Sequence, residues 1–172
     1  EERLILLRQV YEGEARFIRA YHYFNLVRLF GPVFIITERI SAEQAKQYDR
    51  SAVDLVYQQI HDDLEQAATL LPATYAPTDK GRATEWAAKG LLAKVRMTEG
   101  LYDEETEALL SDIITHGGFD LQSTYAAVFD IANELNSEIL FTIRYTGGGI
   151  GLGSPFANYF APLQSGAYVI NG

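Results

Sequence analysis

The chain has 172 residues, of which 48% are hydrophobic and 22% charged, with a formal net charge of −9 and no cysteine. It can bury one sizeable core, so a single domain over 1–172 is expected, and its acidic balance argues against a nucleic-acid partner. The lack of cysteine excludes, within these residues, disulfides, thiolate metal sites, a cysteine nucleophile and a lipidated cysteine.

The two ends of the chain do not look like the boundaries of a domain. The first residues lie in helix-forming sequence, without the basic and apolar regions of a signal peptide. The last residues stop without a terminal element, and no apolar run approaches the roughly 20 residues that a membrane-spanning helix needs. We therefore expect a piece of a longer protein.

The first predicted helix covers 3–30, and its stretch over 13–32 is apolar around most of its circumference. In its second half a polar residue recurs at every third position, at Arg16, Arg19, His22, Asn25 and Arg28. Because a helix completes a turn every 3.6 residues, this line of polar residues winds around the helix and does not form one solvent-exposed face. The helix is thus predicted to be packed on several sides. Arg16 and Arg19 are predicted to form salt bridges there or to cap carbonyls at neighbouring helix ends, because unpaired buried charge is costly.

Further elements follow from capping residues, helix breakers and apolar spacing. The sequence predicts a connector over 33–50, a helix from a Ser51 cap to Pro72, a loop over 73–82, a helix from Thr84 to about Glu99, another from 103–105 to about His116, and a short helix over 123–129.

The spacing of the apolar residues changes from a helical period to alternation near the end of the chain. Residues 138–145 alternate, with Ile139, Phe141, Ile143 and Tyr145 on one face, which predicts a strand. Glycine, proline and aromatic residues dominate 147–172, so little regular structure is expected there. The fold class is therefore mainly all-α, with tetratricopeptide-like helical hairpins and a small β element near the C-terminal part.

With these elements in place, the chain resembles the SusD/RagB family of outer-membrane glycan-binding lipoproteins. The resemblance runs in order over about 13–145 and rests on these segments: Gly13-Glu14-Ala15-Arg16-Phe17-Ile18-Arg19-Ala20-Tyr21-His22-Tyr23-Phe24-Asn25-Leu26-Val27-Arg28-Leu29-Phe30-Gly31-Pro32-Val33, Asp63-Leu64-Glu65-Gln66-Ala67, Gly81-Arg82-Ala83-Thr84, Gly118-Phe119-Asp120-Leu121 and Asn136-Ser137-Glu138-Ile139-Leu140-Phe141.

The resemblance implies a binding protein and not an enzyme. It implies display on the cell outer-membrane surface as a lipoprotein, an oligosaccharide ligand, and partnership with a TonB-dependent transporter of the SusC type. The lipid-bearing cysteine of that family and its large C-terminal half are absent from this sequence.

Three residues are the best candidates for contact with a sugar. Exposed aromatic rings and amide groups suit the apolar faces and hydroxyl rims of sugars. Tyr75 lies in a polar loop, while Asn158 and Tyr159 lie in the glycine-rich tail. No cofactor or metal is expected, because the three histidines are far apart and none is spaced with another ligand.

Two other classes of function stay open. One is a tetratricopeptide-like scaffold that binds only protein or peptide partners. The other is a carboxylate-dependent glycosidase, for which the candidate acids lie in 62–65 and 103–105. Solvation and the helix dipole also explain both acidic groups. An exposed aromatic platform near Tyr75 or Tyr159 would favour glycan binding over the scaffold.

Overall fold

The computed structural model describes residues 2–144, and the part over 1–141 forms one compact helical unit. Residues from Thr142 onward belong to a second unit, so the expected single domain over 1–172 stays a prediction. The helices are α1 (Glu2–Phe30), α2 (Ala42–Ala45), α3 (Val53–Leu70), α4 (Glu85–Glu99), α5 (Glu104–His116) and α6 (Tyr125–Val128), with 3₁₀ turns η1 (Pro77–Asp79) and η2 (Ile131–Asn133).

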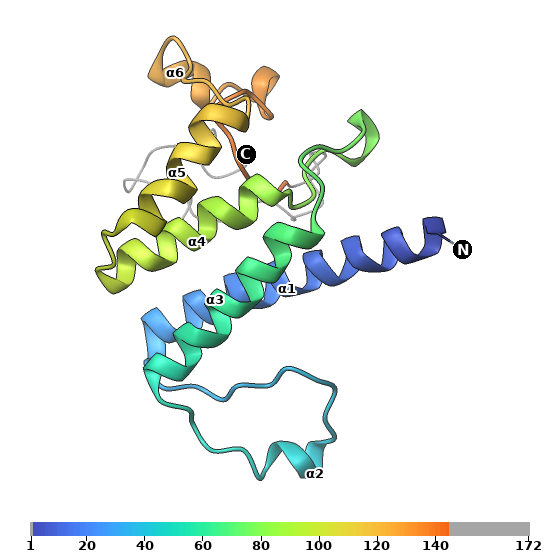
Figure 1. Ribbon diagram of the computed structural model, residues 1–172, viewed down its shortest axis with the longest axis vertical. Helices are drawn as coiled ribbons and strands as arrows, with labels where there is room; N and C mark the ends of the chain where they lie inside the picture. Colours follow the sequence, from blue (N-terminus) through green and yellow to red (C-terminus); the bar gives the residue numbers. More distant parts are fainter. Residues whose placement is uncertain (1, 145–172) are drawn as a thin grey trace, which may run out of the picture. The chain divides into compact units, whose positions relative to one another are not determined.

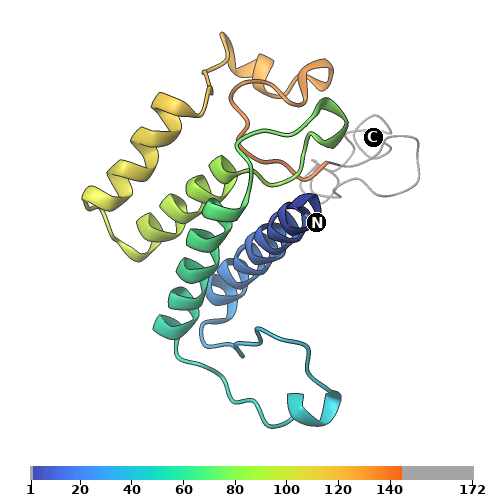
Figure 2. The ribbon, with the colours of Figure 1, turned by 45° about the vertical axis from the view of Figure 1, so that its right-hand side comes forward.

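The long helices pack in chain order. α1 lies against α3, α3 against α4, and α4 against α5, with neighbouring helices running in opposite directions (Figures 1 and 2). This confirms a mainly helical fold built from antiparallel hairpins. Among the described helices, none combines the length and the apolar character that a bilayer span requires.

The core lies between α1, α3 and α4. On α1 the buried side chains recur every three or four residues, which puts them in one stripe. α3 contributes a matching stripe that includes Ile60 and Leu64, both fully buried. α4 has buried residues over more of its surface, including Trp86, Leu92 and Val95, because it packs between α3 and α5.

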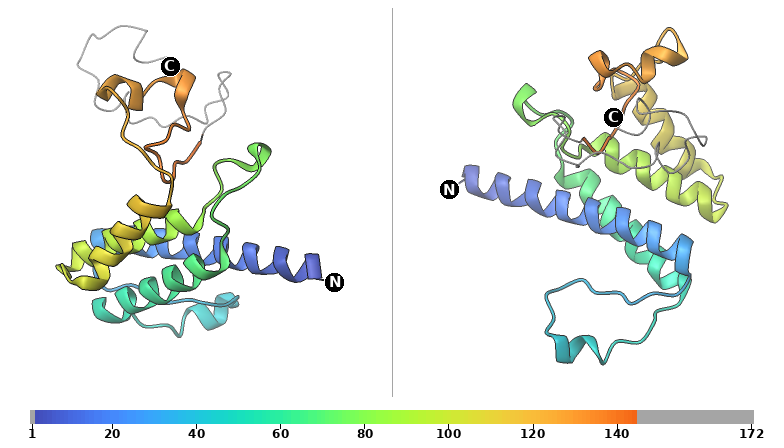
Figure 3. Two further views of the ribbon diagram at one scale, coloured as in Figure 1. Left: turned by 45° about the horizontal axis from the view of Figure 1, so that its top comes forward. Right: turned by 180° about the vertical axis from the view of Figure 1, so that it is seen from behind.

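α1 is packed on fewer sides than its sequence predicts. Its burial begins at Gly13, and every residue from Glu2 to Gln9 is exposed. These first turns project beyond the other helices (Figure 3). Packing on several sides is predicted for 13–32, but burial there is confined to one stripe while Ile18, Leu26 and Leu29 are exposed, so this prediction is wrong.

The connector and the start of α3 differ from the prediction. The connector contains the short helix α2, which Ser41 and Gln44 begin with a reciprocal capping box. α3 starts at Val53 after an Ala52 that makes no side-chain cap, so the predicted Ser51 cap is wrong. Ser51 instead donates its backbone N–H to the Val33 carbonyl at 2.9 Å. This bond closes the connector into a loop that extends away from the helices (Figure 1).

The predicted strand over 138–145 is wrong for the residues that the structure describes, 138–144. A strand needs an extended neighbour to pair with, and none of the described residues supplies one. The alternation in burial also fails, because Leu140 and Phe141 are both partly buried while Ile143 is exposed. Phe141 packs edge-to-face on Phe17 of α1, with ring centroids 4.9 Å apart.

A charged turn joins α4 to α5. Gly100, at φ +84°, ends α4, and the Asp103 carboxylate accepts the Thr106 backbone N–H at 3.0 Å to begin α5. The buried guanidinium of Arg96 donates to the same carboxylate at 2.9 Å. The Thr106 backbone bond first, and the Arg96 bond second, lower the pKa of Asp103 to about 2.

Asp103→Asn is expected to lower the stability of the chain at neutral pH and to lose this effect in acid. Asparagine still caps a helix, so the substitution mainly removes the charge. Because the folded pKa of Asp103 is depressed, its charge stabilises the fold above the unfolded pKa of about 3.9. That contribution disappears as the pH falls toward about 2. Urea unfolding at several pH values should show the two proteins converging, and a difference that does not change with pH would contradict this assignment.

Candidate ligand-binding site

Only one of the three predicted ligand residues lies in the described part of the chain. Tyr75 is in the loop between α3 and α4, where it is half-buried. Asn158 and Tyr159 lie outside the described residues, as does the glycine-rich run 147–153, so their role stays a prediction.

Tyr75 belongs to a cluster that ties its loop to α1. Arg82 forms a two-pronged ion pair with Glu14 of α1, through Nε at 2.6 Å and Nη2 at 2.8 Å. The Tyr75 hydroxyl donates to the same carboxylate at 3.3 Å. The guanidinium of Arg82 also lies over the Tyr75 ring, 4.9 Å from its centroid, and 5.7 Å from the centroid of Tyr11. The cluster therefore fixes the position of an aromatic ring in a loop.

Gly13 makes this arrangement possible. A Cβ atom at this position would come within 2.9 Å of Leu71 Cγ and 3.1 Å of Leu70 Cβ, at the end of α3. The lack of a side chain lets the end of α3, and the loop that follows it, lie against α1 next to Glu14.

The surroundings of Tyr75 keep its hydroxyl group protonated. Burial first, and the Glu14 carboxylate second, raise the pKa of Tyr75 to about 12. The hydrogen bond from Arg82 to Glu14 raises the pKa of Arg82 further above its ordinary value. At neutral pH the cluster is thus a fixed ion pair beside a neutral phenol. A half-buried ring held in this way can stack on a sugar, although Arg82 already covers part of it.

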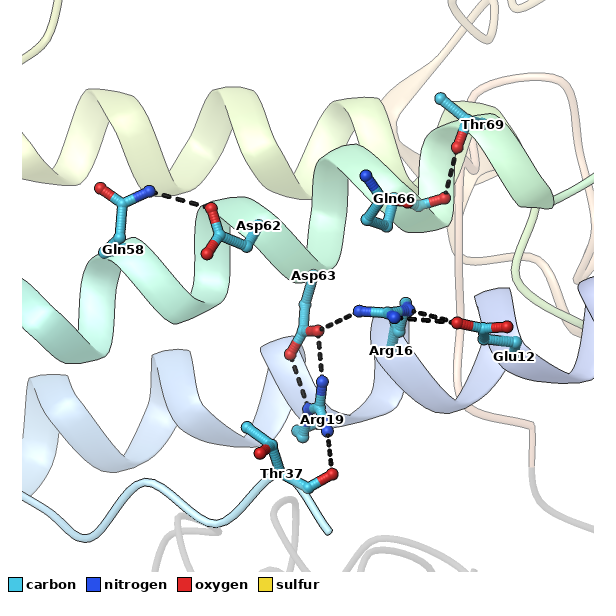
Figure 4. A network of polar contacts seen from close by, with 9 residues as sticks. All are labelled: Glu12, Arg16, Arg19, Thr37, Gln58, Asp62, Asp63, Gln66 and Thr69. Carbon is cyan, nitrogen blue, oxygen red and sulfur yellow. Dashed lines mark hydrogen bonds and ion pairs between the residues drawn. The ribbon is translucent and has the colours of Figure 1, made fainter.

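A second polar site lies on α1, around a buried carboxylate (Figure 4). Asp63 of α3 is fully buried and points between two arginines of α1. Arg19 donates to it through Nε at 2.7 Å and Nη2 at 2.5 Å, and Arg16 through Nη1 at 3.2 Å. Arg16 also pairs with Glu12 at 2.8 Å, and Arg19 donates to the Thr37 carbonyl of the connector at 2.9 Å. The predicted salt bridges of Arg16 and Arg19 are confirmed.

This network forms one wall of an open hollow of about 510 Å³. Its lining is polar apart from one alanine: Glu12, Ala15, Arg16, Arg19, Thr37 and Gln59. The carboxylates of Glu12 and of the buried Asp63 balance the two guanidinium groups. The hollow therefore has no net charge with which to select an anion. It offers hydrogen-bond donors and acceptors but no aromatic ring among its lining residues. The sequence did not indicate it, because Thr37 comes from a connector without a periodic pattern.

Several of the candidate acids, and two of the three histidines, have partners within the chain. Asp62 accepts a bond from Gln58 at 2.9 Å, and Glu105 pairs with Arg96 at 2.8 Å. His61 lies 2.5 Å from Glu99, and His116 lies 2.8 Å from Asp112. Among residues 2–144, no group of three such side chains is arranged to hold a metal ion. Hydrogen bonding, ion pairing and helix capping therefore give four of these acids, Asp62, Asp63, Asp103 and Glu105, a structural role.

Comparison with known proteins indicates a common origin with one family. The sequence profile of a SusD-like family, described as starch-binding and associating with the outer membrane, matches residues 6–97. A SusD-like protein of Formosa agariphila, P25, is 32% identical over 133 residues, which are 77% of this chain and 25% of that protein. This chain spans about a quarter of the length of the curated relatives that it matches.

Solved structures are similar in fold as well. A laminarin-binding SusD-like protein is 28% identical and superposes with a TM-score of 0.73, over 79% of this chain and 31% of that one. A structure described as containing a xylogluco-oligosaccharide is 32% identical, with a TM-score of 0.68, over 79% of this chain and 29% of that one. Both matches cover most of the described helices, so the helical arrangement is shared.

Proposed function

The chain belongs to the SusD-like family, and from this premise we propose that the protein of which it forms a part binds oligosaccharide at the surface of the bacterial outer membrane. The observation that carries the proposal is the similarity, over 79% of the chain in each case, to a laminarin-binding protein and to a structure with a xylogluco-oligosaccharide. Members of this family bind carbohydrate and perform no catalytic step, and the structural roles of the described acidic clusters agree with binding alone.

The finer parts of the proposal concern delivery and location. We propose that the bound oligosaccharide passes to a SusC-like, TonB-dependent transporter, and that a lipid anchor holds the protein at the surface. The family description, which associates its members with the outer membrane, supports the location. Passage to the transporter and the lipid anchor rest on the resemblance of the sequence to the SusD/RagB family. The helical body would then act as a rigid support, with the ligand held by loops.

We propose Tyr75, Asn158 and Tyr159 as ligand contacts. For Tyr75 the support is geometric, because the Glu14–Arg82 ion pair fixes a half-buried ring in a loop. A ring that is already held in place loses little conformational entropy when a sugar stacks on it. For Asn158 and Tyr159 the support is their residue type alone.

Screening the full-length protein against a glycan array, followed by calorimetry on the best ligand, tests the proposal. Binding of at least one oligosaccharide is expected. Uniform absence of sugar binding would overturn the glycan assignment, and capture of a peptide in its place would favour the scaffold alternative.

Tyr75→Ala is expected to weaken that binding by roughly tenfold, which is the effect of losing one stacking ring. Tyr75→Phe should change the affinity little, because the lost hydroxyl bonds to Glu14 within the protein. Tyr102→Ala is a matched control, since this tyrosine is 76% exposed in the turn between α4 and α5 and far from Tyr75 in sequence. Equal affinities of the Tyr75→Ala and Tyr102→Ala proteins would remove Tyr75 from the site.

A further inference from the structure

The open hollow of about 510 Å³ is bounded by three segments of the chain. α1 presents one face to it, because Glu12, Arg16 and Arg19 recur every three or four residues along the helix (Figure 4). Gln59 of α3 and Thr37 of the connector also line it. Small-molecule sites in proteins have volumes of roughly 300–1,000 Å³, so the hollow is large enough for a small ligand.

The two arginines bring hydrogen-bond donors to the hollow in fixed positions. A guanidinium group has five N–H donors, and Arg16 and Arg19 each use three of them on partners within the chain. Their side chains stay 30% and 25% exposed. The fully buried carboxylate of Asp63 holds both groups in place. A ligand that accepts the remaining N–H bonds therefore loses little free energy in ordering them.

The other polar groups of the lining add acceptors and further donors. The Thr37 hydroxyl and the Gln59 amide can each donate and accept, and neither has a hydrogen-bond partner among the residues that the structure describes. The Glu12 carboxylate uses Oε1 for Arg16, which leaves Oε2 as an acceptor. The hollow thus presents donors and acceptors next to one another.

This lining excludes most classes of ligand. Its charges cancel, so an anion or a cation gains little there. A mainly apolar ligand would deprive the polar groups of water without replacing their hydrogen bonds, which is costly. Hydroxyl groups fit, because each one both donates and accepts. We propose that the hollow binds the hydroxyl-bearing edge of an uncharged sugar unit, as a hydrogen-bonding subsite for the oligosaccharide, and this inference rests on the proposed function.

Filling the hollow in the full-length protein tests the proposal. Ala15 lines it from an exposed position of α1, so Ala15→Met adds a larger side chain outside the core and keeps a good helix former. The probe is the neutral oligosaccharide that binds most tightly on the glycan array. Ala15→Met is expected to weaken its binding at least about tenfold in calorimetry, because the added side chain clashes with the sugar. Ala108→Met, at an exposed position of α5, is the matched control and should leave the affinity unchanged.

A second pair of variants removes a hydrogen bond without filling the hollow. Gln59→Ala should weaken binding of the same oligosaccharide by roughly threefold to tenfold, the effect of losing one hydrogen bond. Gln58→Ala is its control, because Gln58 bonds to Asp62 at 2.9 Å and is not part of the lining. Equal affinities of these two variants would overturn the assignment of Gln59 to the subsite.

The outcomes separate this proposal from the proposed function. Unchanged affinity of the Ala15→Met protein would overturn the subsite and leave glycan binding in place. If the rest of the polypeptide fills the hollow, Ala15→Met would lower the free energy of unfolding in urea at unchanged affinity, which also overturns the subsite. Tighter binding of an oligogalacturonate than of the neutral probe, lost in Ala15→Met, would overturn the uncharged class. Absence of sugar binding by the unsubstituted protein would overturn both proposals.

Discussion

Asp63→Ala is expected to lower the free energy of unfolding by about 3–5 kcal/mol, the cost of removing one partner from a buried ion pair. The Asp63 carboxylate has no solvent exposure and accepts bonds from both Arg16 and Arg19. Arg16 would keep Glu12 as a partner, but Arg19 would keep only the Thr37 carbonyl. The hydrogen bond to Asp63 is also the main reason that the pKa of Arg19 is raised. Urea unfolding followed by circular dichroism measures the loss.

A double-mutant cycle separates the ion pair from the packing around it. Asp63→Leu and Arg19→Met each remove one charge, and the double variant removes both. Because the second substitution removes the unpaired charge that the first leaves, the double variant should be less destabilised than the sum of the single variants, by roughly 1–3 kcal/mol. Additive effects would mean that the two side chains stabilise the fold independently, in conflict with the short contacts between them.

Local features of the sequence predict most of the helices. Thr84 caps α4 through a bond from the Ala87 N–H at 3.2 Å, Asp103 caps α5, and Gly100 ends α4 in the left-handed conformation. Each of these signals acts within a few residues, so it can be read without knowing the fold. The start of α3 shows the limit of this approach. Ser51 is a good capping residue, but its backbone is held by Val33, which is distant in sequence.

Features that depend on distant partners could not be predicted. The arginines of α1 indicated salt bridges, yet nothing local identified Asp63, 44 residues from Arg19, as the partner. The alternation over 138–145 predicted a strand, but a strand also needs a neighbour, and its sequence does not encode one. The sequence places Tyr75 in a polar loop, whereas the structure shows a half-buried ring that is hydrogen-bonded to α1. A site built by loop contacts of this kind is not visible in sequence periodicity.

Phe17→Ala is expected to cost about 3–5 kcal/mol of unfolding free energy, in the range found for large core side chains. The Phe17 side chain is 1% exposed and lies in the stripe of α1 that packs on α3. It also touches Phe141 edge-to-face, so one substitution removes packing against two parts of the chain. Urea unfolding of the variant measures the loss, and Phe17→Leu, which retains much of the volume, should cost clearly less.

Substitution of Phe141, the ring that Phe17 contacts, tests whether the segment after α6 packs on the helical core. Phe141→Ala should cost less than Phe17→Ala, because Phe141 is only partly buried. If the two rings interact, combining the substitutions should destabilise the chain by less than the sum, by about 0.5–1.5 kcal/mol for an aromatic pair. Strict additivity would mean that the two rings do not stabilise each other, in conflict with their edge-to-face contact.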